Sequence, residues 1–301
     1  MLYLKKIPLD SSLLKTLRLA DSRIGALKHT MFFSSKESRL LRYEKRLYKG
    51  KTPRDNSYLG YAIPGARLLQ QIYGPEARYA PIHALPESYL EGLKAFEVAL
   101  TVINDGIFAI HNSVPFLSCD VFSYRITYDV NGYPRTIPLF RGSVLQFRSN
   151  RQTEEPVTIE SKSILNLPSS RKVETESIEF DRRFKVTSSS PEEALYVLAP
   201  KVILQWLELQ RTLDAKIWAQ YESDTLTLAI PGTNVRILGK SLFGSYDKKL
   251  EQIARCMRVP RLIVDTLRLD IPLTEGTLPD SNTWFESRKQ ISCEPYTIWI
   301  G

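Results

Sequence analysis

Residues 122–139 read FSYRITYDVNGYPRTIPL, and this stretch decides the fold class. Apolar or aromatic side chains alternate with polar ones from Phe122 to Val130, and a period of two is typical of β-strands with one buried face. Asn131-Gly132 then predicts a hairpin with a type I′ turn, after which Tyr133–Leu139 returns as the second strand. Pro134 and Pro138 lack a backbone N–H, so we expect the returning strand at the edge of a sheet.

Strand signals continue on both sides of this hairpin. Before it, residues 97–103 and 107–110 flank Asn104-Asp105-Gly106, which predicts a second hairpin. After it, the polar stretch 149–175 is expected to form loops around one short strand at 157–161. The sequence therefore predicts a mainly antiparallel sheet.

Helix signals appear after this region. Residues 178–186 are predicted to form a further strand, because Phe180 and Phe184 lie an even number of positions apart and would share its buried face. Ser190-Pro191-Glu192-Glu193 is then a capping box, with proline at the first helical position. A second helix is predicted to follow from Pro200.

The last third of the chain completes an α+β pattern. Residues 217–221 and 225–230 flank Glu222-Ser223-Asp224, which predicts another hairpin. A helix is predicted at about 241–257, and residues 263–269 are expected to form a helix or a strand. The fold class expected from the whole pattern is α+β: a mixed, mainly antiparallel sheet packed by helices, with a basic helical N-terminal segment.

The composition is that of a folded protein, since 43% of the 301 residues are hydrophobic and 25% are charged. Cys119, Cys256 and Cys293 are far apart and odd in number, which argues against a disulfide framework and favours reduced, buried thiols. We expect no signal peptide, because lysines follow the first four residues at once, and no membrane span, because no stretch offers about 20 apolar residues.

The positive charge is concentrated in the first fifth of the chain. Residues 1–60 carry 14 Lys/Arg and five Asp/Glu, a net charge of +9, whereas the rest of the chain carries −1. Helices are predicted there at 10–29 and 36–49. The basic residues of the second helix form the candidate polyanion-binding site, which comprises Arg39, Arg42, Lys45, Arg46 and Lys49.

Several ligands fit this basic segment. Localised positive charge attracts nucleic acid or an anionic membrane surface. Tyrosines interleaved with the basic residues suit stacking on unpaired bases or an interfacial belt on a membrane. These tyrosines are Tyr43, Tyr48, Tyr58 and Tyr61. The segment equally suits a protein partner, or a solvated face docked on the rest of the chain.

Signals of catalysis or cofactor binding are weak. Gly239-Lys240-Ser241 resembles the end of a phosphate-binding loop, but the glycine required five positions earlier is Asn234. None of the three histidines lies at metal-ligand spacing from another. Cys119-Asp120 with His111 upstream can be drawn as a thiol–imidazole pair, although a buried cysteine is ordinary in a strand-rich region. We predict no catalytic residue, no metal site and no cofactor.

A series of segments in the second half carries a family resemblance. In chain order these segments are Phe140–Phe147, Ile178–Val186, Ser190–Ala194, Leu198–Pro200, Leu226–Pro231, Leu242-Phe243 and Ile263–Leu269. The order resembles the uncharacterised bacterial family catalogued as domain of unknown function 3137, over roughly residues 135–272. The resemblance implies no established activity and no catalytic residue. Its members often look membrane-anchored through hydrophobic helices, whereas this chain has basic amphipathic helices.

These observations give one expectation for organisation and one for function. Residues 1–60 form a basic helical segment, and residues 61–301 form an α+β domain whose family-like part is 135–272. We expect a non-enzymatic binding or interaction protein of bacterial type, cytoplasmic or peripheral at a membrane, whose partner is a protein or an anionic membrane surface. The alternatives are a nucleic-acid-binding protein that uses residues 1–60 and an enzyme of unrecognised type.

Overall fold

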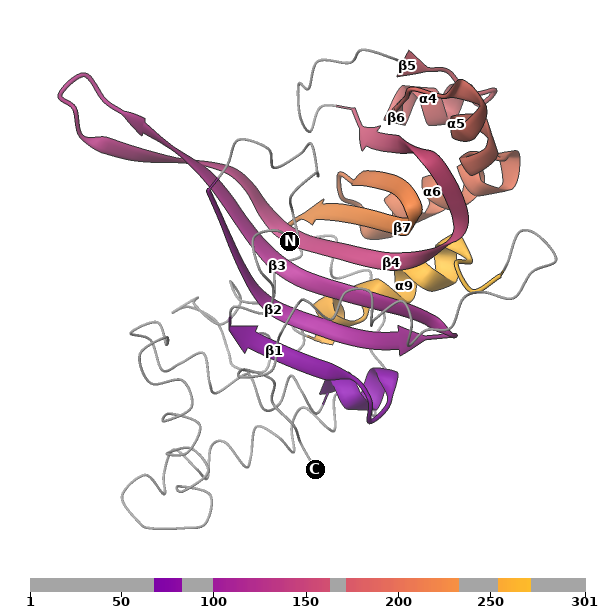
Figure 1. Cartoon of the computed structure of the whole chain (residues 1–301), viewed down its shortest axis with the longest axis horizontal. Coiled ribbons are helices and arrows are strands. Elements are labelled where there is room, and N and C mark those ends of the chain that lie inside the picture. The colour runs from indigo at the N-terminus through magenta and orange to yellow at the C-terminus, as the bar shows by residue number, and fades with distance from the viewer. Residues whose placement is uncertain (1–67, 83–99, 163–171, 233–253, 272–301) are drawn as a thin grey trace, which may run out of the picture.

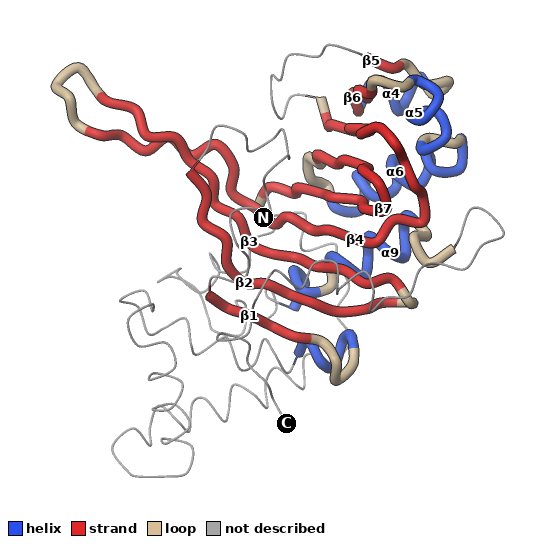
Figure 2. Tube along the Cα trace, in the orientation of Figure 1, coloured by secondary structure: helices blue, strands red, loops and turns tan. Residues whose placement is uncertain are grey.

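The computed structural model describes residues 68–82, 100–162, 172–232 and 254–271. These residues form one sheet with helices packed against one of its faces (Figures 1 and 2), which confirms the α+β class. The basic residues 1–60, with both helices predicted there, and most of the helix predicted at 241–257 lie outside the described residues.

Seven strands make the sheet, in the order β1-β2-β3-β4-β6-β5, with β7 pairing β4. Every pairing among the described strands is antiparallel, so this part of the sheet is not mixed. The strands are β1 (Arg78–Ile82), β2 (Leu100–His111), β3 (Val114–Tyr128), β4 (Pro134–Ser161), β5 (Lys172–Val173), β6 (Phe184–Ser188) and β7 (Trp218–Pro231).

The hairpin predicted at Asn104-Asp105-Gly106 is wrong, because these residues form a bulge inside β2. The register against β3 shifts between Asn104 and Ile107, and Asp105 takes the left-handed conformation with φ 54°. Asp105 is buried, and its Oδ1 accepts a hydrogen bond from the Tyr79 hydroxyl at 2.5 Å. The chain reverses instead at Asn112-Ser113, where φ values of 47° and 63° match a two-residue type I′ turn.

The hairpin at Asn131-Gly132 is confirmed, but its turn is of another type. The backbone carbonyl of Asp129 accepts a hydrogen bond from the Gly132 N–H at 3.0 Å, and Gly132 has φ 78° whereas Asn131 does not have a positive φ. This combination is a type I turn followed by a glycine bulge rather than a type I′ turn.

β4 and β7 are longer than the sequence predicts. β4 is one strand of 28 residues that continues through 149–156, where loops are predicted, and it buries Arg151 and Thr153. β7 runs through Glu222-Ser223-Asp224, where Ser223 has φ 53°. Both halves of β7 pair with β4, so the predicted hairpin is wrong. In both strands, turn-forming residues mark irregularities that bend a continuous strand.

Residues 178–183 form a helix where the sequence predicts a strand. This helix, α4 (Ile178–Arg183), begins after Ser177, whose side chain accepts a hydrogen bond from the Phe180 N–H at 3.3 Å. Phe180 and Phe184 do share a face, and their rings stack with centroids 4.8 Å apart. Because residues four apart lie on one face of a helix as well as of a strand, this spacing did not distinguish the two.

The capped helix pair is confirmed, and a last helix covers the same face of the sheet. Ser190 caps α5 (Pro191–Val197), and α6 (Pro200–Leu213) follows it. Residues 259–267 form α9 (Val259–Leu267), which decides the helix-or-strand alternative in favour of a helix.

The hydrophobic core lies between the sheet and these helices. Trp206 of α6 is fully buried there, and its ring meets those of Phe184 and Tyr221 edge-on, at centroid distances of 6.3 and 6.4 Å. Cys119 and Cys256 are buried free thiols, as predicted, and Cys293 lies outside the described residues.

Candidate functional site

The β3–β4 hairpin projects beyond the rest of the sheet as a two-stranded arm (Figure 1). β2 pairs with β3 only as far as Tyr124, and β7 pairs with β4 only from Gly142 onward. Between these limits, within the described part of the chain, the two strands pair with each other alone. We call residues 124–141 the arm.

The arm has one apolar face and one mixed, basic face. Tyr124, Ile126 and Tyr128 alternate along β3, so their side chains share a face. They stand opposite two prolines and a threonine of β4. The other face carries Arg125 and Arg135, together with a threonine and an isoleucine. Such an amphipathic strand pair normally covers a core, but here no other described strand pairs with either strand of the arm.

The tip of the arm exposes large apolar side chains to solvent. Val130 is 101% exposed, and Tyr128 and Tyr133 on either side of it are 73% and 68% exposed. Ile126 and Leu139, further back, are also more than a third exposed. Scattered exposed apolar residues are ordinary, but a group of them on one projecting element indicates a contact surface.

Several backbone N–H groups at the tip have their partners inside the turn. Asp129 Oδ1 accepts hydrogen bonds from the N–H groups of Asn131 and Tyr133, at 2.9 and 3.0 Å. The Asp129 N–H donates to the Tyr133 carbonyl at 3.0 Å. Asp129 Oδ2 lies 3.3 Å from the Arg135 guanidinium. Asp129 is the one acid in residues 124–141, so the carboxylate that could repel an anionic partner is held by the turn itself.

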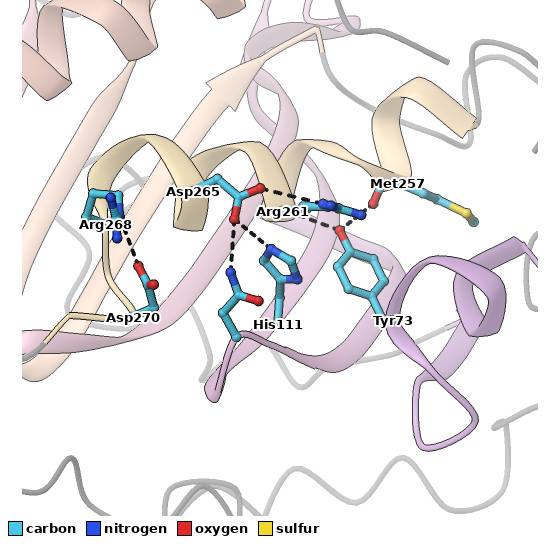
Figure 3. Close-up of polar contacts among 8 residues, drawn as sticks. Tyr73, His111, Met257, Arg261, Asp265, Arg268 and Asp270 are labelled. Atoms are coloured by element: carbon cyan, nitrogen blue, oxygen red, sulfur yellow. Dashed lines mark hydrogen bonds and ion pairs between the residues drawn. The ribbon is translucent and has the colours of Figure 1, made fainter. Parts of the chain in front are cut away.

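A polar cluster joins α9 to the β2–β3 turn (Figure 3), and it is the second candidate site. His111 Nε2 lies 2.7 Å from Asp265 Oδ1, and Asn112 Nδ2 donates to the same oxygen at 3.3 Å. Arg261 Nε lies 3.5 Å from Asp265 Oδ2. The cluster therefore connects residues more than 150 positions apart in the sequence.

Tyr73 extends this cluster to the helical residues 68–73. Its hydroxyl donates to the Met257 carbonyl at 2.7 Å and accepts from the Arg261 N–H at 3.2 Å. Burial raises the pKa of Tyr73 above its ordinary value, so the phenol stays protonated and keeps its role as a donor. Together with the contacts of Asp265, these bonds connect residues 68–73, the β2–β3 turn and the α9 region.

A histidine–carboxylate pair is also a common general base, so the cluster has to be tested as a catalytic site. Among the described residues, the polar partner of the His111 ring is Asp265, and the ring stands edge-on to Tyr73 with centroids 6.2 Å apart. His111 and Asn112 of the β2–β3 turn both bond Asp265 of α9, and Arg261 pairs with Asp265 within that helix. The His111–Asp265 cluster therefore indicates a structural link between β2 and α9 rather than a catalytic site.

The structure does not bring Cys119 and His111 together. His111 pairs with Val114, and Cys119 lies five residues further along β3, about 17 Å away at the rise of a strand. Burial raises the pKa of the Cys119 thiol well above its ordinary value, and the neighbouring carboxylate of Asp120 raises it further. A protonated thiol is a poor nucleophile, so a thiol–imidazole pair gains no support.

The candidate residues of the basic segment lie outside the described residues, and their grouping stays a prediction. They are Arg39, Arg42, Lys45, Arg46 and Lys49.

The sequence analysis did not identify the arm as a site. A signal was present, because Val130 and Tyr133 are large apolar residues directly beside Asn131-Gly132, where turns normally carry polar ones.

The described ranges contain neither a metal-binding cluster nor a membrane-spanning helix. In the described ranges, no three His, Cys, Asp or Glu side chains gather in a way that could hold a metal ion. The helices described there do not include one with the length and apolar character needed to cross a bilayer.

Comparisons with known proteins give a family match for part of the chain. No curated protein matches the sequence. A crystal structure of the mycobacterial trehalose monomycolate transport factor A, TtfA, is similar at 12% sequence identity and a TM-score of 0.37. The similarity covers 72% of this chain and 99% of that one, and it is too low to show a shared fold. Residues 138–269, a little under half of the chain, match the family described as "Protein of unknown function (DUF3137)", which confirms the family resemblance seen in the sequence.

Proposed function

We propose that this chain is a non-enzymatic binding protein that acts at an anionic surface, through the arm and the basic segment 1–60. The observation that carries the proposal is the exposure of Tyr128, Val130 and Tyr133 at the tip of an arm that packs against no other described element. Water-exposed apolar side chains of this size contribute little to the folded state, so a contact made on binding is the economical explanation for them.

The polar features of the described residues support binding rather than catalysis. The His111–Asp265 pair connects two elements of the body, and the arm lies elsewhere in the molecule (Figures 1 and 3). Burial raises the pKa values of the thiols of Cys119 and Cys256, which keeps both protonated and unreactive.

The charge of the chain supports an anionic partner. The net +9 of residues 1–60 exceeds the +8 of the whole protein, so the rest of the chain is close to neutral. A charge concentrated in this way attracts polyanions over a distance set by the ionic strength.

Nucleic-acid binding is the second candidate function. It is favoured by the tyrosines that lie among the basic residues of the N-terminal segment, since aromatic rings stack on unpaired bases while Lys and Arg contact phosphates. The tyrosines in question are Tyr43, Tyr48, Tyr58 and Tyr61.

Binding of the full chain to single-stranded DNA, to RNA and to vesicles containing phosphatidylglycerol tests both candidates. We expect vesicle binding that weakens steeply as salt is raised, because counterions are released on association. Replacement of Arg39, Arg42, Lys45, Arg46 and Lys49 by Gln should weaken it strongly while the circular dichroism spectrum is retained. Binding to nucleic acid but not to vesicles would select the second candidate, and affinity for none of them at low salt would overturn both.

A further inference from the structure

We infer that the arm is a lipid-insertion element: its tip, residues 128–133, enters the interfacial layer of an anionic bilayer while the arginines behind it contact the phosphates. This inference rests on the proposed function and names the contact that the arm makes. Three properties of the arm carry it: the order of its side chains along its length, the internal satisfaction of its turn, and its charge.

Along the arm, the large exposed side chains at the tip precede the first arginine, whereas the exposed Ile126, Ile137 and Leu139 lie behind Arg135. Val130 is outermost, followed by Tyr128 and Tyr133, and Arg135 comes next along β4. Arg125 lies still closer to the sheet. The tip and the first arginine behind it match the layers of a bilayer from inside to outside, because hydrocarbon favours aliphatic groups, the interface favours the amphipathic tyrosine ring, and the headgroups favour cations.

The turn lowers the cost of transfer into a layer of low polarity, because most of its backbone N–H groups already have partners. Of the five backbone N–H groups of residues 129–133, those of Asp129, Asn131, Gly132 and Tyr133 donate within the turn. An N–H without a partner is costly to bury in lipid, because no water replaces the bond. The Asp129 side chain is 14% exposed and faces Arg135, so the carboxylate enters as part of an ion pair.

The charge of the arm matches an anionic membrane. Arg125, Arg135 and Arg141 are all exposed, and the one acid of the arm, Asp129, is paired with Arg135. Three arginines against one acid leave residues 124–141 with a net charge of +2. Each arginine near an anionic surface strengthens binding about fivefold. The apolar tip supplies the remaining attraction, since a large side chain moved out of water strengthens binding about tenfold or more.

A second copy of the chain or another protein strand suits the arm less well. Pro134 and Pro138 remove two backbone donors from β4, which protects the β4 edge of the arm against pairing with another strand. Two arms of like charge would also repel each other. These features favour lipid over strand addition.

The first test measures vesicle flotation of the full chain in which Arg39, Arg42, Lys45, Arg46 and Lys49 are Gln, which lowers the net charge of residues 1–60 from +9 to +4 (nine bases against five acids). With phosphatidylglycerol mixed into phosphatidylcholine, the triple variant Tyr128→Ser/Val130→Ser/Tyr133→Ser should bind at least about tenfold more weakly than its parent. The matched control, Ile178→Ser/Tyr196→Ser/Leu204→Ser, removes exposed apolar side chains from the helices and should leave binding unchanged.

The second test locates the tip directly. A polarity-sensitive fluorophore is attached to Val130→Cys in a Cys293→Ser background, in which the two remaining native thiols are buried. Its emission should shift to the blue when phosphatidylglycerol vesicles are added, and a fluorophore at Leu204→Cys should not respond. Arg125→Gln/Arg135→Gln/Arg141→Gln should reduce the preference for anionic over neutral vesicles.

The outcomes separate this inference from the proposed function. If the wild-type chain binds vesicles but the tip variant binds equally well and the fluorophore at 130 does not respond, the lipid role of the arm is wrong while anionic-surface binding stands. A response at 130 that depends on protein concentration without vesicles would assign the arm to a second copy and overturn the inference. If neither the wild-type chain nor any variant binds an anionic ligand, both proposals fail.

Discussion

Gly142 of β4 packs directly against the backbone of Ile230 in β7. A β-carbon at position 142 would overlap the Ile230 carbonyl oxygen and lie 2.6 Å from the Cα of Pro231, and its three nearest atoms would all be backbone atoms of β7. Backbone atoms of paired strands cannot move aside as a flexible side chain can. We therefore expect Gly142→Ala to lower the free energy of unfolding by about 2 to 3 kcal/mol, measured by urea denaturation.

Gly132 provides the matched control for this prediction. It has φ 78° and no atom near the position of a β-carbon, so Gly132→Ala carries the conformational cost of the left-handed region without a clash. That cost should be about 1 kcal/mol. Equal losses for the two variants would mean that the contact between β4 and β7 is looser than the structure shows.

His111 and Asp265 should be energetically coupled across the junction between β2 and α9. A double-mutant cycle with His111→Gln and Asp265→Ala, followed by thermal or urea unfolding, should give a coupling free energy of about 0.5 to 1 kcal/mol, because the carboxylate is 42% exposed and screened by water. Asp265→Ala alone should cost more than His111→Gln, since Asp265 also contacts Arg261 and Asn112. Strictly additive effects would show that the pair contributes nothing to stability.

Ser190 and Glu193 should contribute independently to the start of α5. The Ser190 hydroxyl accepts the backbone N–H of Glu193, so Ser190→Ala should cost about 1 kcal/mol. The Glu193 carboxylate does not close the predicted capping box, because it accepts the N–H groups of Glu154 and Glu155 in β4, at 3.1 and 3.0 Å. The losses for Ser190→Ala and Glu193→Ala should therefore add in the double variant, whereas a reciprocal box would make them less than additive.

The protein should lose stability at alkaline pH. Burial raises the pKa of Tyr221 above its ordinary value of 10.0 and the pKa values of Cys119 and Cys256 above 9.0. Because the folded pKa is higher than the unfolded one, each group adds stability that is fully present below its ordinary pKa and is lost as the pH rises toward the folded pKa. Each contributes up to about 1.4 kcal/mol per pH unit in that range. Urea midpoints measured from pH 7 to above pH 10 test this, and Cys256→Ala should make the decline less steep.

The local signals of the sequence placed the hairpin at Asn131-Gly132 and the start of α5 at Ser190 correctly, because a glycine in a turn and a cap at a helix end act within a few residues. The same kind of signal failed at Asn104-Asp105-Gly106 and Glu222-Ser223-Asp224. There a neighbouring strand is long enough to pair on both sides of the turn-forming residues, so the chain bends and continues.

The sequence by itself determined the class of the fold, the identity of the buried aromatic residues Phe180 and Phe184, and the chemistry of the exposed arm, since all of these follow from the order of apolar and polar side chains. Tertiary structure alone decided that the arm projects free of β2 and β7, and that His111 meets Asp265. The physical reason is that the projection of the arm depends on where pairing between strands stops, and the His111–Asp265 pair depends on a contact between residues far apart in the chain. The spacing of nearby residues encodes neither of these interactions.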